Sequence, residues 1–176
     1  MKIISTSIKG LFEICPFING DDRGWFSRIY DSNIFKNTIP GFNGNWVQVN
    51  HSFSRDKFTW RGFHFQKEPY QEVKMVKCVS GRIIDYVLDL RENSETYLKI
   101  YSTELSKDNG KMIYIPMGCA HGFLTQEANT ELIYFHDEFY NPEFESGVKY
   151  YDKKISLKLP AKPNNISNRD KNHPDL

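Results

Sequence analysis

Three side chains of this chain have the types needed for proton transfer beside a carbonyl group. His64 lies in RGFHFQ, residues 61–66, and a histidine gains and loses protons near neutral pH, which suits a general base. Lys74 is a cation that can stabilise the enolate oxygen formed when a proton is removed. Tyr134, in ELIYFHDEFY, is a candidate acid for returning a proton on the opposite face. Because inversion of a carbon centre needs a group on each face, the set predicts epimerisation.

The residues around His64 predict how a strand presents this base. Successive side chains of a strand point to opposite faces, so His64 and Gln66 should share one face. Arg61 reaches that face only if the strand carries an extra residue, a β-bulge, and Gly62 is the natural place for it. The same alternation predicts that Lys74 points inward together with Glu72.

A second motif offers a competing metal site. In IPMGCAHGF, residues 115–123, Pro116, Gly118 and His121 match the PxGxxH pattern of the second cupin motif. In that motif a strand carries the histidine into the mouth of a jelly-roll barrel. A metal-dependent cupin, an oxygenase or isomerase, would join His121 to His64 and so stays open as an alternative.

The remaining ligand positions argue against this metal site. Gln66 stands where the first cupin motif usually has its second histidine, and a neutral amide carbonyl is a weak transition-metal ligand. Lys74, next to the potential ligand Glu72, would repel a divalent cation. We therefore expect a metal-free pocket.

The elements that position these groups are predicted to be strands. Short apolar and aromatic runs recur between turn signals such as the Asn-Gly pairs at 19–20, 43–44 and 109–110, which favours an all-β sandwich or barrel. One short helix is expected near residues 32–37, capped by Asp31 or Ser32. Strands are expected at 11–17, 24–30, 45–53, 58–66, 72–79, 82–89, 97–104, 111–115, 119–126, 130–139 and 147–152.

Composition predicts a single domain, residues 1–176, because the chain is long enough for one well-buried core and short for two. A net charge of +1 argues against nucleic-acid binding. The first residues match neither a signal peptide nor a membrane span, so we expect a cytoplasmic protein. The three cysteines are expected as free thiols.

Several polar residues receive structural interpretations. The polar segment PAKPNNISNRDKNHPDL, residues 160–176, has three prolines and no periodicity, so its composition predicts a loose tail. Strand-end ion pairs are expected for Asp85, Asp89 and Arg91, and a solvated turn for Glu143 and Glu145.

An ordered series of segments resembles the dTDP-4-dehydrorhamnose 3,5-epimerase family from about Phe17 to the C-terminus. The segments are DDRGWF, VQVNHS, RGFHFQ, KMVKCVSGRIIDYVLDLRENSETY, LSKDNGKMIYIPMGCAHGF, YFHDEFYNPEFESGV and SNRDK. The resemblance implies a cupin jelly roll, or double-stranded β-helix, with short flanking helices. It implies a homodimer without metal or other cofactor. The implied reaction is epimerisation of a dTDP-4-keto-6-deoxy-hexose at C3 and C5, as in dTDP-L-rhamnose-type deoxysugar biosynthesis for polysaccharides.

The resemblance also implies roles for residues. His64 matches the base, Asp170 the carboxylate that orients it, Lys74 the oxyanion partner and Tyr134 the general acid, so the tail would fold back over the site. Phe139 falls where a tyrosine commonly stacks on the base. Arg23 and Phe26 match a segment that reaches the neighbouring subunit's ligand. The substrate-binding positions are Arg23, Phe26, Gln48, Asn50, Arg61, His121, Phe139 and Arg169.

The chain departs from the family pattern at two places near the site. Ser27-Arg28 replaces a usual acidic ending of the DDRGWF segment, which leaves the nucleotide and sugar open. Phe63 replaces a leucine beside the base and is expected to reshape the sugar pocket. The alternatives are a single-centre 3- or 5-epimerase on another nucleotide 4-keto sugar, the metal-dependent cupin and a non-catalytic sugar-binding cupin.

Overall fold

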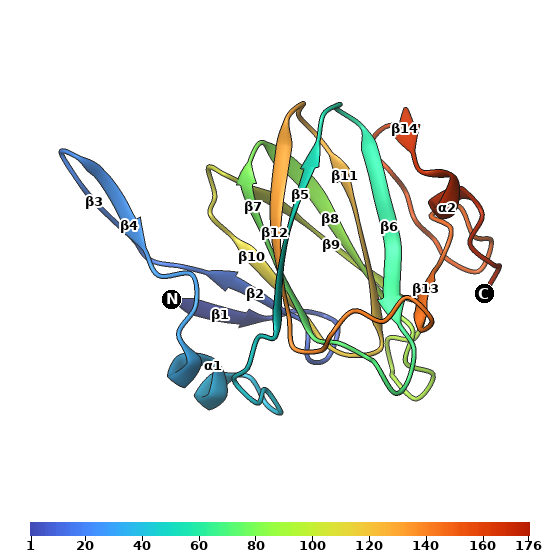
Figure 1. Ribbon diagram of the computed structural model, residues 1–176, viewed down its shortest axis with the longest axis horizontal. Helices are drawn as coiled ribbons and strands as arrows, with labels where there is room; N and C mark the ends of the chain where they lie inside the picture. The colour runs from blue at the N-terminus through green and yellow to red at the C-terminus, as the bar shows by residue number, and fades with distance from the viewer.

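The computed structural model describes residues 1–176, and two six-stranded sheets form a barrel (Figure 1). The first sheet has the order β1-β2-β10-β7-β12-β5. Its strands are β1 (Lys2–Ser5), β2 (Phe12–Cys15), β10 (Met112–Ile115), β7 (Lys74–Ser80), β12 (Thr130–His136) and β5 (Gln48–Ser54). All pairs in this sheet are antiparallel.

The second sheet has the order β13-β6-β11-β8-β9, with β14 pairing in parallel with β6. Its strands are β13 (Glu145–Gly147), β6 (Thr59–Gln66), β11 (Cys119–Thr125), β8 (Arg82–Asp89), β9 (Ile100–Ser106) and β14 (Asn165–Ile166). The separate hairpin of β3 (Ile18–Asp21) and β4 (Gly24–Ser27) stands out from the barrel. The predicted all-β class is therefore confirmed.

Strand alternation divides the apolar residues among three clusters. On β7, Val76 and Cys78 face the interior between the sheets with Ile83, Val87 and Leu132. Met75, which precedes Val76 on the strand, packs on the outer face beneath the segment of α1 (Ser32–Thr38). A third cluster covers the outer face of the second sheet. It includes Trp60, Phe63, Leu88, Val148 and Ile155. The apolar interior fills one part of the barrel and leaves room for a polar cavity.

The bulge predicted in β6 is present. His121 of β11 lies opposite His64, whereas Phe123 lies opposite Arg61, so β6 carries one more residue than its partner over this span. Both Arg61 and His64 consequently line the cavity. Gly62 has a φ of +127°, and a Cβ there would lie 2.4 Å from the Cα of Gly122, so only glycine fits.

The expectation that Phe63 reshapes the sugar pocket is wrong. Its side chain is fully buried in the outer cluster, edge-on to Trp60 with ring centroids 5.4 Å apart. The same alternation that turns His64 inward turns its neighbour outward. Phe63 therefore supports the outer face of β6 and does not contact the cavity.

The expectation of a loose tail is also wrong. Residues 165–171 form β14 and α2 (Asn168–Lys171), and both lie beside β6 (Figure 1). Asp170 of α2 is only 3% exposed. Polar composition misled here, because the tail is ordered by pairing with β6 and by packing its few apolar side chains, Ile166 and Leu176 among them, against the outer cluster. The expected strand at 147–152 is likewise replaced by the short β13 followed by turns.

The helix prediction is confirmed. Asp31 caps α1, since its side chain accepts hydrogen bonds from the backbone N–H groups of Asn33 and Ile34. Neither α1 nor α2 is long and apolar enough to cross a membrane.

Candidate active site

A cavity of about 260 Å³ opens between the two sheets. It collects most of the residues that the sequence singled out. These are Gln48, Asn50, Arg61, His64, Lys74, His121, Tyr134 and Arg169. Most of the side chains that line the cavity are polar, and they point inward because alternate residues of a strand face the same side. The cavity therefore suits a polar ligand.

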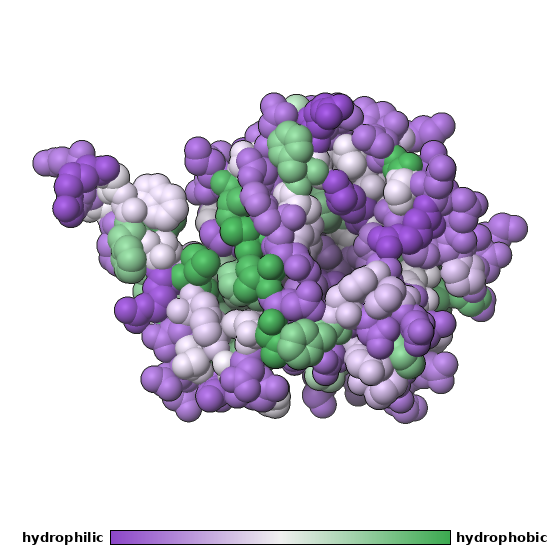
Figure 2. All heavy atoms as spheres, in the orientation of Figure 1, coloured by the Kyte–Doolittle hydropathy of each residue, from purple (hydrophilic) through white to green (hydrophobic).

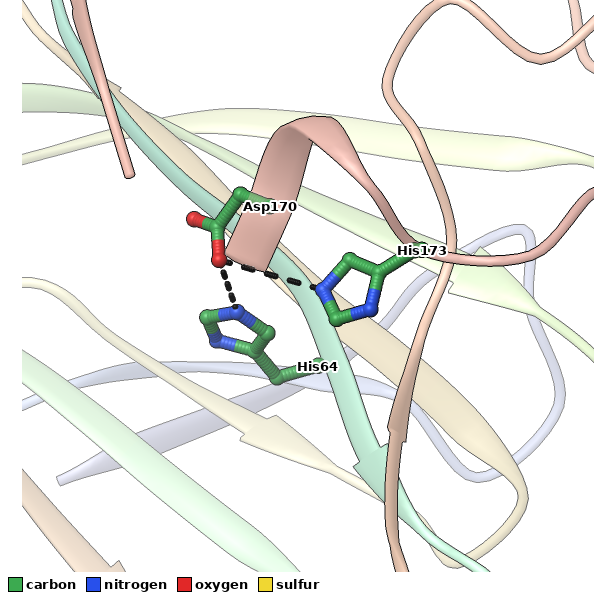
Figure 3. Close-up of side chains that lie close together, drawn as sticks. All are labelled: His64, Asp170 and His173. Carbon is green, nitrogen blue, oxygen red and sulfur yellow. Dashed lines mark hydrogen bonds and ion pairs between the residues drawn. The ribbon is translucent and has the colours of Figure 1, made fainter. Parts of the chain in front are cut away.

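His64 is held by a carboxylate from the C-terminal segment (Figure 3). Its Nε2 lies 2.9 Å from Oδ1 of Asp170. The other carboxylate oxygen accepts a 3.1 Å hydrogen bond from the backbone N–H of Gly62. Ser167 caps α2 by accepting from the N–H of Asp170. The carboxylate is thus fixed at both oxygens, and Nδ1 of His64, which has no partner within the chain, is left to act as a base.

The charge of Asp170 follows from its contacts. Burial alone would raise the pKa of this carboxyl, but the hydrogen bond and charge of His64 and the Gly62 N–H hold its pKa at about 2. Asp170 is therefore ionised at neutral pH. An ionised carboxylate keeps the proton on Nε2 and stabilises the imidazolium that forms when Nδ1 takes a proton.

The lowered pKa of Asp170 predicts an acid-sensitive contribution to stability. Its folded pKa of about 2 lies below the unfolded value of about 3.9. The stabilisation is therefore present above the unfolded pKa and is lost as pH falls through the folded one. We expect a contribution of about 2 kcal/mol to the free energy of unfolding, lost between about pH 5 and pH 1.

Urea unfolding of the wild type and of Asp170→Asn at several pH values checks this prediction. The difference in free energy of unfolding between the two proteins should be near its full value at pH 5 and shrink below about pH 4. A difference that does not change down to pH 2 would contradict the lowered pKa of Asp170.

Lys74 belongs to a charged network on the other sheet. Its Nζ lies 2.9 Å from Oε1 of Glu72, whose Oε2 lies 2.7 Å from Nδ1 of His136. Burial opposes ionisation of Glu72, but the bond with His136 and the charge of Lys74 lower its pKa to about 2. The predicted inward pair of Glu72 and Lys74 is confirmed, and the carboxylate fixes the ammonium group at the cavity wall.

Tyr134 lines the cavity from β12. Its hydroxyl lies 2.9 Å from Oγ of Ser52 on β5. Burial raises its pKa above the ordinary value, so the hydroxyl keeps its proton near neutral pH. A protonated phenol fixed by one neighbour can donate to a developing carbanion, which is the role of a general acid.

His121 is a buried cavity histidine. Its Nε2 lies 2.6 Å from Oδ2 of Asp85, and both residues are almost inaccessible to solvent. The expected strand-end ion pair for Asp85 is wrong, because Asp85 lies within β8 and holds this histidine. The expectation is correct for Asp89, which pairs with Arg91 at 2.8 Å.

Two arginines stand at the cavity's polar edge. Nε of Arg61 donates to Oγ of Ser54 at 3.1 Å, and Nη1 of Arg169 lies 2.7 Å from Oε2 of Glu145. The hydroxyl of Tyr140 donates to the same Glu145 oxygen at 2.7 Å. The solvated-turn expectation is therefore wrong for Glu145, which lines the cavity. Guanidinium groups placed this way suit an anionic ligand such as a diphosphate.

The cupin-type metal ligands are already engaged. Oε1 of Gln66 accepts from the N–H of Asn141 at 2.7 Å, so this amide anchors the loop that follows β12. Glu72 is paired with Lys74 and His136, and His121 with Asp85. The ammonium of Lys74 supplies positive charge beside these groups. This donor set does not suit a transition metal.

Three predicted binding residues do not line the cavity of this chain. Arg23 and Phe26 lie on the β3–β4 hairpin, where Arg23 pairs with Asp21 and Phe26 is 66% exposed. Phe139 is 61% exposed, and its neighbour Tyr140 lines the cavity in its place. Their ligand contacts stay predictions that depend on a second subunit or a moving loop.

Sequence reasoning missed several residues that support the site. His136 lies two residues after Tyr134 on the same strand, so alternation alone could have placed it in the cavity. Ser52 follows by the same rule from Asn50. No sequence signal links Glu145 to Arg169, since their contact depends on how the C-terminal segment packs.

Comparison with known proteins identifies the family of this chain. The family model described as dTDP-4-dehydrorhamnose 3,5-epimerase matches residues 5–176. The chain belongs to this family. It is 35% identical over 172 residues to the dTDP-4-dehydrorhamnose 3,5-epimerase of Shigella flexneri, covering 98% of this chain and 94% of the relative.

Solved structures of the epimerase family overlay on nearly the whole chain. The dTDP-4-dehydrorhamnose 3,5-epimerase of Elizabethkingia anophelis has a TM-score of 0.94 and 38% identity, covering 100% of this chain and 96% of that one. A dTDP-6-deoxy-D-glucose-3,5-epimerase of Legionella pneumophila in complex with dTDP-4-keto-L-rhamnose has a TM-score of 0.92 and 31% identity, covering 98% and 90%. The expected cupin jelly roll is therefore confirmed, and this epimerase is an enzyme of the isomerase class.

Proposed function

We propose that this enzyme epimerises C3 and C5 of a dTDP-4-keto-6-deoxy-hexose in the formation of a dTDP-L-rhamnose-type sugar. One observation carries the proposal. His64 and Tyr134 line the same cavity from opposite sheets, the first on β6 and the second on β12. A sugar ring between them would meet a base on one face and an acid on the other, which is what inversion requires.

The mechanism begins with proton removal beside the C4 keto group. Nδ1 of His64 takes the proton, and Asp170 stabilises the imidazolium through Nε2. The electron pair of the broken C–H bond moves to the C4 oxygen, where Lys74 stabilises the negative charge. Tyr134 then donates its proton to the opposite face of the carbon, which restores the ketone with inverted configuration.

The remaining predicted residues are proposed to bind the substrate. Arg61 and Arg169 at the cavity's edge suit the diphosphate. Polar contacts with the sugar are assigned to Gln48, Asn50 and His121, all in the cavity wall. Phe139 is proposed to stack on the base, which its exposed ring allows after a movement of its loop.

The enzyme is proposed to be a homodimer in which Arg23 and Phe26 reach the partner's substrate. The β3–β4 hairpin projects from the barrel (Figure 2), and its side chains Ile18, Trp25 and Phe26 are at least half exposed. Val49 and Phe53 of the edge strand β5 are similarly exposed. Covering these exposed apolar side chains with a second subunit would remove their surface from water, which favours association.

We also propose that the enzyme works in the cytoplasm. Its cysteines, Cys15, Cys78 and Cys119, are all free thiols. Unpaired thiols are the rule where the compartment is reducing.

Proton NMR in D₂O with dTDP-4-keto-6-deoxyglucose tests the proposed reaction. Loss of the C3 and C5 proton signals, abolished by His64→Ala, is the expected result. Loss at one position would establish a single-centre epimerase instead. No exchange at either position would overturn the proposed substrate and point to an epimerase that acts on another nucleotide 4-keto sugar.

A further inference from the structure

A third ionisable side chain lies beside the His64–Asp170 pair. His173 follows α2, and its Nε2 is 3.8 Å from Oδ1 of Asp170 (Figure 3). The rings of His64 and His173 meet edge-on, with centroids 5.7 Å apart. The mechanism above gives His173 no task.

The ring nitrogen of His173 is buried without a partner. The side chain is 8% exposed, and Nε2 makes no hydrogen bond. Leaving a buried polar atom unsatisfied costs about 1–3 kcal/mol. The space for this nitrogen depends on a glycine, because a Cβ on Gly147 would lie 2.3 Å from it. A buried ring nitrogen thus faces a carboxylate and a second imidazole.

We propose that His64, Asp170 and His173 form a binding site for a divalent transition metal such as Zn²⁺. One ligand atom from each residue lies within 4.8 Å of the other two. Ligand bonds of about 2.0–2.2 Å in a tetrahedron separate the ligand atoms by roughly 3.3–3.6 Å, so small side-chain shifts suffice. Imidazole nitrogens with one carboxylate favour Zn²⁺, Co²⁺, Ni²⁺ or Cu²⁺ over Mg²⁺ and Ca²⁺.

The surroundings of the three ligands orient the carboxylate, and the nearby cation is already paired. Nε of Arg169 lies 3.9 Å from Oδ1 of Asp170, but its guanidinium is bound to Glu145 at 2.7 Å and must stay with that partner when an ion binds. The N–H of Gly62 holds the second oxygen of Asp170, which is the kind of outer contact that orients a metal-bound carboxylate. His64 alone of the three lines the cavity, so an ion can enter there. Three protein ligands leave a fourth position for water, as in accessible zinc sites.

Occupation of this site would inhibit the enzyme. When the metal binds Nε2 of His64, the imidazole stays neutral and no proton is lost from the ring, because the ring proton that Nε2 carried is transferred through solvent to Nδ1. That nitrogen becomes a hydrogen-bond donor and can no longer remove a proton from the substrate. The site is thus proposed as a reversible inhibitory metal site and not as a cofactor site.

Metal binding is tested without reference to activity. Chelator-stripped wild type, His173→Phe and His173→Gln are dialysed against Zn²⁺, and the bound metal per folded chain is measured. His51→Phe is the matched control, because Nε2 of His51 also lies beside a carboxylate, 2.8 Å from Glu131, on the exposed strand β5. One Zn²⁺ per chain is expected for the wild type and the control.

Both His173 variants should bind Zn²⁺ at least about tenfold more weakly. Equal binding by either folded variant, or no binding by the wild type, would overturn the site. If His173→Phe does not fold, His173→Gln alone provides the test.

The inhibitory part rests on the proposed function of His64 and has a separate readout. Zn²⁺ should stop deuterium exchange by the wild type, EDTA should restore it, and Mg²⁺ should have no effect. Inhibition that is equally strong in the His173 variants would overturn this part. If the wild type binds Zn²⁺ through His173 but shows no exchange even without metal, the proposed reaction fails while the metal site stands.

Discussion

Replacement of His64 by asparagine should lower the rate of deuterium exchange at the substrate carbon by about 10²- to 10⁴-fold, because the reaction loses its general base. The asparagine amide ends near the position of Nδ1 and does not reach Asp170, but that carboxylate keeps its hydrogen bond from the N–H of Gly62, so the fold around β6 should persist. The measurement is the rate of deuterium exchange, followed by NMR in D₂O, with circular dichroism to verify that the variant is folded. A folded variant that retains more than about a tenth of the wild-type rate would contradict the assignment.

A double-mutant cycle distinguishes catalysis from simple packing. His64 and Asp170 act as one unit if the carboxylate serves only to orient and charge the imidazole. Asp170→Asn alone should then lower the rate, and the double variant His64→Asn/Asp170→Asn should be little worse than His64→Asn. Additive losses in the cycle would mean that Asp170 contributes to the reaction by another route.

The second large effect is expected for Lys74→Met. Loss of a preorganised charge at a developing oxyanion typically costs about 10² to 10³ in kcat. Glu72 keeps its partner His136 in this variant, so the carboxylate is not left alone in the cavity wall. The measurement is steady-state kinetics with separate kcat and KM values. The loss should appear mainly in kcat.

Lys77→Met is the matched control for this prediction. Lys77 is on the same strand, but its Nζ donates to the backbone carbonyl of Gly110 outside the cavity. Its kcat should stay near the wild-type value. If Lys74→Met changed only KM, Lys74 would be a binding residue with equal effect on the ground state and the transition state.

Local sequence patterns predicted the barrel strands well. The expected strand at 82–89 coincides with β8, and the one at 119–126 differs from β11 by a single residue. These segments are apolar runs bounded by turns, so their structure is specified locally. The segment at 147–152 misled because Tyr150 packs on Trp60 from a turn, which supplies aromatic burial without a strand.

A site residue could be predicted where neighbouring residues of its own strand position it, and could not where distant parts of the chain do. His64, Lys74 and Tyr134 could be proposed from their chemistry and strand alternation. Asp170 could not, because its burial comes from partners 106 and 108 residues away in the sequence. Only the family resemblance indicated that the segment carrying it folds over the site. The prediction for Phe63 was wrong because Phe63 is next to the base in sequence but, by strand alternation, points to the opposite face of the sheet.

Because β14 and α2 attach to the outside of the barrel beside β6, the segment that carries Asp170 can open while the barrel stays folded. The segment carrying Asp170 adds a two-residue strand and one short helix to the outside of a barrel whose sheets pair without it. Such an appendage can open locally at much lower free energy than the whole domain unfolds. Each opening leaves His64 in place but without its carboxylate. With Asp170 orienting the base as proposed, the fraction of active molecules would follow the closing equilibrium of this short segment, and the barrel could remain intact in molecules that do not turn over substrate.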